Sequence, residues 1–215
     1  MSPAAVDVQD RPSRGGERRR RAAAAVDVLL REAPPILAAS VDESCRCILA
    51  ARLVVDVLGR LDVPVVPIPV SVAAANRWAV ALAEKRIAFD EAVRLGASVV
   101  MTETSVVRPG RYPAHLVCYV PDLRLVVDLD AQQFARPARA IYVPPATRFR
   151  ANARVLRGEE VVDLALPDDG VLSYSRIVAP LADYREAPNW RAPNRAMLAL
   201  AAALAEAARD RPAAG

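Results

Sequence analysis

The chain has one histidine, His115, and the pattern around it is that of a β-hairpin. Two apolar runs, residues 114–120 and 123–129, flank Pro121-Asp122, a dipeptide that favours a tight turn. A two-residue loop there, or a four-residue loop over 120–123, places His115 directly opposite Asp128. Opposed side chains have Cβ atoms about 4.5–5.5 Å apart, so the carboxylate could accept the imidazole N–H and fix its tautomer. Such a pair supplies the base and the orienting group of a catalytic triad.

The same register predicts which side chains share a face of the hairpin. One face carries His115, Val117, Tyr119, Arg124, Val126 and Asp128, and the other carries Leu116, Cys118, Val120, Leu123, Leu125 and Val127. Because the second face is wholly apolar, we interpret Cys118 as a core cysteine. Asp130 shares the face of Asp128 but lies one diagonal further from His115, which makes it the weaker partner.

The nucleophile must come from another element, and a helix that begins near Asp42 or Ser44 offers two thiols. Cys47 leads an apolar stripe at helical spacing, formed by Ala51, Val54, Leu58 and Leu61. Cys45 leads a mostly polar face instead. Cys47 therefore points toward the core from the first turn of its helix, where unpaired N–H groups and the helix dipole favour a thiolate.

These segments resemble a known group of proteins. The stretch C-I-L-A-A-R-L-V-V-D-V-L-G-R-L-D-V-P-V, residues 47–65, is similar to the nucleophile helix of transglutaminase-like and related papain-like thiol proteins. In that family the cysteine opens a helix that ends in a leucine-glycine-isoleucine-proline turn, and here Leu61-Asp62-Val63-Pro64 occupies the turn with Asp62 in place of glycine. Residues 115–128 resemble the family's histidine and aspartate strands in order and approximate spacing.

Residues 132–134, Q-Q-F, are similar to a segment of uncharacterised bacterial members of the family, and the resemblance spans roughly residues 42–137. It implies cysteine-dependent acyl transfer or hydrolysis at an amide or ester, with Cys47, His115 and Asp128 as the triad. Hydrolysis and transfer stay open, as does a catalytically inactive binding module of the same fold. We expect a peptide, a protein or a small amide or ester as substrate. Polar residues close in sequence to the site or to the predicted edge strand over 63–72 could supply the oxyanion donor, and these are Gln133, Gln132 and Asn76.

A zinc site is the rival interpretation, because Cys45, Cys47, His115 and Cys118 could be counted as four ligands. The directions of the side chains argue against it. His115 and Cys118 are three apart on a strand and face opposite sides, and Cys45 and Cys47 diverge around their helix. We therefore expect neither a metal nor a cofactor.

The composition favours a soluble cytoplasmic protein. The chain has 215 residues with three cysteines, and its first twenty residues are polar and Arg-rich rather than a signal peptide. No apolar run reaches the ~20 residues that a membrane span needs. The net charge is +4, but the basic residues are nearly all arginine, with Lys85 the only lysine. We interpret this bias as a G+C-rich coding habit, and it does not favour nucleic-acid binding.

The elements that must position the site predict an α+β fold, in which the nucleophile helix packs on an antiparallel sheet between N- and C-terminal helices. We expect a disordered basic tail over residues 1–18, a single domain over 19–190, and an Ala-rich helix and tail over 191–215. The predicted helices are residues 19–33, 42–61, 77–95 and 194–209. Besides the hairpin, the predicted strands are an edge strand over 63–72 and short strands over 140–143, 161–164 and 171–178.

Overall fold

The computed structural model describes residues 14–39, 46–102, 112–179, 183–193 and 195–211. The helices are α1 (Arg14–Ala38), α2 (Arg46–Gly59), α3 (Arg77–Ala83), α4 (Phe89–Arg94), α5 (Ala153–Leu156), α6 (Pro188–Arg191) and α7 (Arg195–Arg209). The strands are β1 (Val66–Ala75), β2 (Val99–Met101), β3 (His115–Val120), β4 (Leu125–Asp128), β5 (Thr147–Arg150), β6 (Val162–Ala165) and β7 (Val171–Arg176). Short 3-10 helices connect several of them, among which η1 (Pro121–Leu123) and η2 (Ala131–Phe134) bear on the site.

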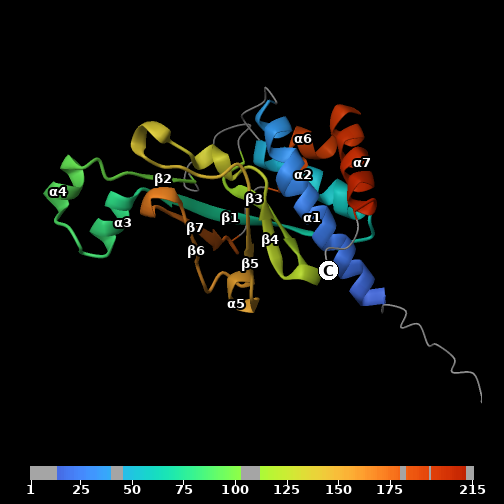
Figure 1. Cartoon of the computed structure of the whole chain (residues 1–215), viewed down its shortest axis with the longest axis horizontal. Helices are drawn as coiled ribbons and strands as arrows, with labels where there is room; N and C mark the ends of the chain where they lie inside the picture. Colours follow the sequence, from blue (N-terminus) through green and yellow to red (C-terminus); the bar gives the residue numbers. More distant parts are fainter. Residues whose placement is uncertain (1–13, 40–45, 103–111, 180–182, 194, 212–215) are drawn as a thin grey trace, which may run out of the picture.

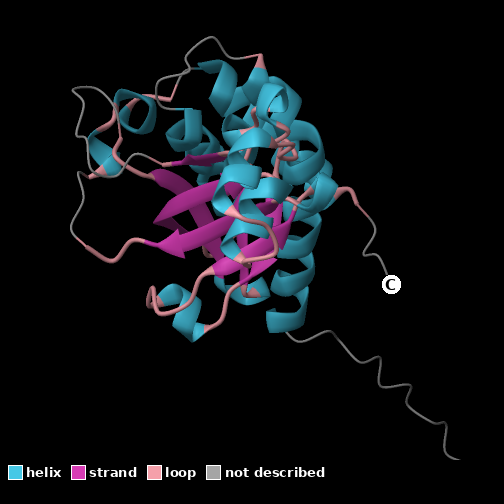
Figure 2. Ribbon diagram, turned by 90° about the vertical axis from the view of Figure 1, so that its left-hand side faces the viewer, coloured by secondary structure: helices cyan, strands magenta, loops and turns pink. Residues whose placement is uncertain are grey.

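The strands form one antiparallel sheet in the order β5-β4-β3-β1-β7-β6, and β2 pairs with the far end of β1. Helices α1, α2 and α7 lie together on one side of this sheet (Figures 1 and 2). Helices α3 and α4 lie at the opposite end of the molecule, beside β2 (Figure 1). The expected α+β class with an antiparallel sheet is therefore confirmed.

The sheet curls strongly, so that it is nearly closed. Strands β5 and β7 are four strand positions apart, which in a flat sheet would separate them by about 19 Å. Yet the rings of Phe149 in β5 and Tyr174 in β7 have centroids 4.8 Å apart, and Thr147 Oγ1 lies 3.0 Å from the Tyr174 hydroxyl. Curling thus brings side chains from distant strands into one interior.

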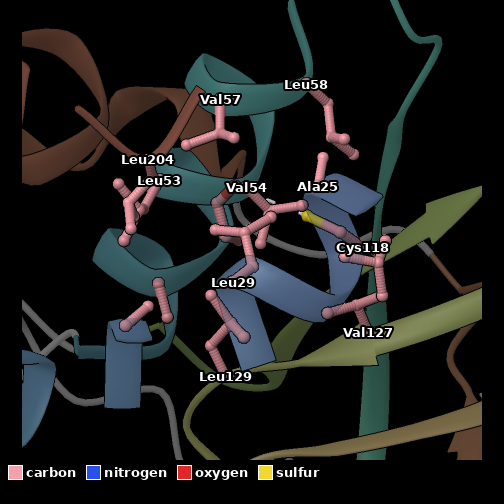
Figure 3. Packing of buried hydrophobic residues seen from close by; sticks show 14 of the residues in the cluster. Ala25, Leu29, Leu53, Val54, Val57, Leu58, Cys118, Val127, Leu129 and Leu204 are labelled. Carbon is pink, nitrogen blue, oxygen red and sulfur yellow. Dashed lines mark hydrogen bonds between the residues drawn. The ribbon is translucent and has the colours of Figure 1, made fainter. Parts of the chain in front are cut away.

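Two clusters of buried side chains result. The helical core lies between α1, α2, α7 and the outer face of the sheet, and it includes Leu29, Val54, Leu204, Cys118 and Val127 (Figure 3). The sheet-interior core is enclosed by the curl and includes Ile68, Val117, Val126, Phe149 and Tyr174. Cys118 is fully buried and its thiol faces α2, within 3.4 Å of the Ala51 carbonyl oxygen, so its prediction as a core cysteine is confirmed.

Helix α2 ends in a paired hydrogen-bond motif that reverses the chain toward β1. The Val63 N–H donates to the Leu58 carbonyl, and the Asp62 N–H donates to the Gly59 carbonyl, at 3.0 and 3.2 Å. This Schellman pattern requires a left-handed residue, and Asp62 adopts it with φ of 56°. Asp62 thus takes the conformation for which glycine is usual, and aspartate tolerates it better than most residues.

Helix α1 is longer than predicted at both ends. It begins at Arg14, inside the expected tail, and Arg18 forms a bidentate ion pair with Asp122 at 2.6 and 2.9 Å. It also continues through Pro34-Pro35, where we expected it to stop. Each proline removes one helical hydrogen bond, and the buried Ala33 and Leu37 hold this end of the helix against the helical core despite that loss.

Strand β1 is central, which corrects the predicted edge strand. Prolines 67 and 69 lie in the half of β1 that pairs with β3, and pairing with β7 starts only at Val70. The Ile177 N–H donates to the Pro69 carbonyl, so the missing N–H of that proline points to the β7 side, just beyond the β7 ladder. The missing donor of Pro69 therefore costs the sheet at most the terminal hydrogen bond of the β7 ladder.

The other predictions vary in accuracy. The hairpin strands, the strands near 161–164 and 171–178 and the last helix are confirmed, whereas residues 140–143 contribute only the bridge between Arg136 and Ile141. The predicted helix over 77–95 is two short helices, α3 and α4, and strands β2 and β5 were not predicted. Helix α7 packs on α1 and α2 as part of the domain (Figure 1). In the described part of the chain, none of the helices combines the length and apolar character that a membrane crossing requires.

Replacement of Leu29 by alanine tests the contribution of α1 to the fold. Leu29 has no exposed surface and packs in the helical core, so we expect Leu29→Ala to lower the free energy of unfolding by about 2–5 kcal/mol. Ile36 on the same helix is 44% exposed, and Ile36→Ala serves as the control with a much smaller loss. Urea denaturation measures both, and equal losses would contradict this packing.

Candidate active site

The hairpin that carries His115 has a different register from the predicted one. Cys118 pairs with Val127 and Val120 with Leu125, so the loop contains the four residues 121–124. Residues 121–123 form the 3-10 turn η1, and Arg124 closes it in the left-handed conformation with φ of 53°. Continued to the end of the hairpin, this register puts Asp130, not Asp128, opposite His115. The prediction of direct opposition between His115 and Asp128 is therefore wrong by two positions.

A shift by two positions preserves the faces of both strands, because side chains alternate with a period of two. Val117 and Val126 contribute to the sheet-interior core, and Leu116, Cys118 and Val127 contribute to the helical core, as the faces predict. His115 and Asp128 therefore still share a face, now as diagonal neighbours. Diagonal Cβ atoms lie about 7–8 Å apart, a gap that an imidazole and a carboxylate can bridge.

His115 and Asp128 make this bridge in a dry environment. The distance from His115 Nε2 to Asp128 Oδ2 is 2.8 Å, and each side chain is only 1% exposed. The ring of Phe134, from η2, packs on the imidazole in a T-shaped arrangement with a centroid distance of 5.2 Å. The imidazole is thus held in one orientation by a carboxylate on one side and an aromatic ring on another.

The Asp128 carboxylate is fully supplied with donors. Besides His115, the Tyr174 hydroxyl donates to Oδ2 at 2.8 Å, and the Asp130 backbone N–H donates to Oδ1 at 2.9 Å. Buried carboxylates are stable in the charged form only when hydrogen bonds replace the lost water. Asp128 meets that condition through His115 on the adjacent strand, the Asp130 N–H in the following turn, and Tyr174 on a distant strand.

The second ring nitrogen of His115 faces the groups that would do the chemistry. Gln133 places its side-chain amide nitrogen, Nε2, 2.6 Å from Nδ1, so in this orientation of the amide Gln133 donates to Nδ1. Burial acts to lower the pKa of His115, but the charge and hydrogen bond of Asp128, together with a hydrogen bond and charge from Cys47, raise it to about 10. Because Asp128 holds Nε2, the nitrogen available to Cys47 is Nδ1. A protonated Nδ1 needs an acceptor instead, which is either a Cys47 thiolate or the Gln133 amide turned over so that its oxygen faces the ring.

Cys47 lies in the first turn of α2 and is 7% exposed, with its stripe of Ala51, Val54, Leu58 and Leu61 fully in the helical core. The predicted direction of Cys47 is therefore confirmed. The helix runs along the outer face of the sheet, so its N-terminal turn meets the end of the hairpin where β3 begins. Cys45 and the proposed caps Asp42 and Ser44 lie outside the described residues.

An ion pair between Asp130 and Arg46 adjoins the same site. Arg46 Nε donates to Asp130 Oδ1 at 2.6 Å, and Asp130 is 3% exposed. Burial raises the pKa of Asp130 to about 6, against the opposing charges of Arg46 and His115. Its carboxylate is therefore ionised at neutral pH and pairs with Arg46 rather than with His115. The pair connects the turn after β4 to the residue that precedes Cys47.

The structure does not bring all of the proposed oxyanion donors to this place. Gln133 contacts the imidazole, whereas Gln132 is exposed to solvent. Asn76 caps α3, and its side chain is used in four hydrogen bonds, with Ala79, Ser98, Gly96 and Arg139. It also lies six residues along β1 from Val70, which pairs with His115, or about 20 Å away. Asn76 is thus a structural cap, and its inclusion in the site is wrong.

Sequence reasoning missed several residues that complete the site. Tyr112 stands three residues before His115, and burial, then the negative charge of Cys47, raise the pKa of its hydroxyl. Its ring packs edge-to-face on Tyr184 with centroids 6.5 Å apart. Tyr174 was also not predicted, although the alternation of side chains along β7 indicates that it faces the sheet interior. Its partner Asp128 lies three strands away in the sheet, a relation that no local pattern encodes.

Comparison of the chain with protein-family models, with curated proteins and with solved structures found no match. Among the described residues, no group of three or more histidine, cysteine, aspartate or glutamate side chains is arranged to hold a metal ion.

The two candidate zinc ligands of the hairpin do not share a face. His115 and Cys118 lie on opposite faces of β3, as the hairpin pattern predicts.

The raised pKa of Asp130 predicts a pH-dependent stability. Its value of about 6 in the folded protein exceeds the ordinary 3.8, so the folded state binds this proton more tightly than the unfolded chain. The resulting stabilisation is complete below pH 4 and disappears as the pH rises through 6, a change on the order of 3 kcal/mol. Wild type should therefore lose stability relative to Asp130→Asn between pH 4 and pH 7.

Denaturant unfolding at several pH values checks this expectation. Asp27→Asn is the matched control, because Asp27 forms an ion pair of the same 2.6 Å length with Arg148 but is half exposed. Its profile should run parallel to that of wild type. A parallel profile for Asp130→Asn as well would show that Asp130 titrates like an ordinary carboxyl.

Proposed function

We propose that this protein is a thiol hydrolase or acyltransferase, in which Cys47 is the nucleophile, His115 the acid-base group and Asp128 the orienting carboxylate. The observation that carries the proposal is the buried 2.8 Å contact of His115 with Asp128 on one ring nitrogen, while Cys47 acts on the same imidazole. This is the relation of nucleophile, base and orienter that covalent catalysis requires.

We infer that Cys47 reacts as a thiolate beside a protonated His115. The pKa of His115 is about 10, because the charge and hydrogen bond of Asp128 outweigh the effect of burial, so the ring keeps its proton at neutral pH. In the first step the Cys47 sulfur bonds to the carbonyl carbon of the substrate. The bond from that carbon to the amide nitrogen or ester oxygen then breaks, and His115 gives its proton to the leaving group.

The second step regenerates the thiolate. Water or an amine attacks the carbonyl carbon of the thioester, His115 takes the proton of the attacking group, and the carbon–sulfur bond breaks. Water gives hydrolysis and an amine gives acyl transfer, so the reaction depends on what reaches the thioester. The substrate in either case is a peptide, a protein or a small amide or ester.

The arrangement also fits the resemblance to transglutaminase-like proteins. The cysteine opens a helix that packs on an antiparallel sheet, and the histidine and aspartate follow in consecutive strands of that sheet. Asp62 takes the left-handed conformation at the turn where that family has glycine. These features support the proposed class without depending on any single residue type.

Burial favours a second candidate function, a catalytically inactive binding module of the same fold. His115 and Asp128 are each 1% exposed and Cys47 is 7% exposed, which suits core residues as well as a closed active site. The two functions differ in one chemical property. An active triad has a reactive thiol at Cys47, and a structural remnant does not.

Selective alkylation tests the nucleophile. At about pH 6 and low iodoacetamide concentration, we expect Cys47 to be modified before Cys45 and Cys118, because the protonated His115 favours its thiolate. His115→Ala should slow the modification of Cys47 by roughly tenfold or more, because the thiolate loses its counter-ion. Site-resolved mass spectrometry measures the rate at each cysteine.

Cys118 serves as an internal control in the same experiment. Burial, and then the charge of Asp128, raise the pKa of its thiol, so it should stay unmodified while the protein is folded. Preferential labelling of Cys45, or a Cys47 rate that ignores the loss of His115 in a folded variant, would favour the binding module.

A pair of aspartate variants tests the orienting group. Asp128→Asn removes the charge that holds His115 Nε2, whereas Asp130→Asn removes the partner of Arg46. We expect the first to slow Cys47 alkylation near neutral pH by roughly tenfold or more and the second to have a much smaller effect. Equal rates for the two variants would contradict the assignment of Asp128. Circular dichroism should first show that both are folded.

A further inference from the structure

A single carboxylate oxygen, Asp128 Oδ2, accepts two side-chain hydrogen bonds, from His115 Nε2 and from the Tyr174 hydroxyl, both at 2.8 Å. We propose that Tyr174 is a positioning residue that holds this carboxylate and adjusts how strongly His115 keeps its proton. The catalytic meaning of the inference rests on the proposed function, whereas the coupling between the two side chains can be measured without any activity.

The direction of the hydrogen bonds follows from the chemistry of the groups. An ionised carboxylate has no proton to give, so the Tyr174 hydroxyl must donate to Asp128. Its oxygen is then left to accept, and the Thr147 hydroxyl, 3.0 Å away, must donate to it. The three groups form a polarised chain from Thr147 through Tyr174 to Asp128. In such a chain each donation strengthens the next.

The position of Tyr174 is fixed independently of the site. The residue is 1% exposed in the sheet-interior core, and its ring packs on Phe149 with centroids 4.8 Å apart. Burial, followed by the charge of Asp128, raises the pKa of its hydroxyl well above the ordinary value. Tyr174 therefore stays protonated over the whole working range and always has a proton to donate.

Sharing of Oδ2 has a definite effect on His115. When the imidazolium loses its proton, the charge of Asp128 is no longer neutralised, and the bond from Tyr174 becomes stronger. The hydroxyl therefore stabilises the state with neutral imidazole more than the state with imidazolium. It follows that Tyr174 lowers the pKa of His115 and brings the ring closer to the range in which it can exchange a proton.

His115 is the only histidine of the chain, so its ring signals in an NMR titration of tag-free protein have no overlap from other histidines. We expect Tyr174→Phe to shift the titration midpoint of His115 to higher pH, because the competing donor is lost while the packed ring remains. Thr147→Val should give a smaller shift in the same direction. Tyr119→Phe is the matched control, since Tyr119 packs on the same core but makes none of these contacts with Asp128, and it should leave the midpoint unchanged.

An unchanged or lowered midpoint in folded Tyr174→Phe would overturn the inference. If that variant does not fold, an unchanged or lowered midpoint in Thr147→Val would overturn the inference in the same way. A purely structural role would lower the melting temperature of Tyr174→Phe and leave the midpoint of His115 in place. Iodoacetamide rates at Cys47, measured on the same samples, separate the two proposals. A shifted midpoint with an inert thiol keeps the positioning role and removes the acyl-transfer function.

Discussion

The Asp128 carboxylate carries a negative charge into the interior of the sheet, where it has almost no contact with solvent. Removing such a charge from water costs far more than one hydrogen bond returns, so it must be met from several directions. An imidazole, a phenol and a backbone N–H meet it here. Each comes from a different part of the chain, and the curl of the sheet, the turn after β4 and the start of β3 must all be correct at once. The position of this one carboxylate therefore constrains much of the fold.

The parts of the structure that could be predicted are those in which neighbours in sequence are also neighbours in space. The apolar stripe of α2 gave the direction of Cys47, and alternation along the hairpin gave the faces of His115 and Cys118. Both depend only on the repeat of a helix or a strand. The contact between His115 and Asp128 could also be predicted, because it requires only that both side chains share a face and span the distance between diagonal neighbours.

The parts that could not be predicted involve contacts between distant segments or unusual local conformations. Arg124 adopts a left-handed conformation, although glycine, asparagine and aspartate are the residues that favour it. The residue types therefore do not predict that the hairpin loop spans 121–124. The prolines of β1 suggested an edge strand, and only the point at which β7 ends shows that they lie at the margin of its ladder. Tyr174 reaches Asp128 through the curl, which depends on the whole sheet. Asn76 directly precedes α3 and caps it, so its side chain is used in the helix cap rather than in the site.

The two-residue difference in the hairpin has an evolutionary consequence. Without a bulge, lengthening or shortening the turn at 121–124 by one residue would rotate β4 by half a repeat relative to β3. Asp128 would then face α1 and α2, and Val127 would face the imidazole. A change of two residues leaves each side chain on the same face of the sheet and only moves Asp128 and Asp130 along β4 relative to His115. Where the pairing shifts with the turn, length variants that keep His115 and Asp128 on one face should therefore differ by even numbers.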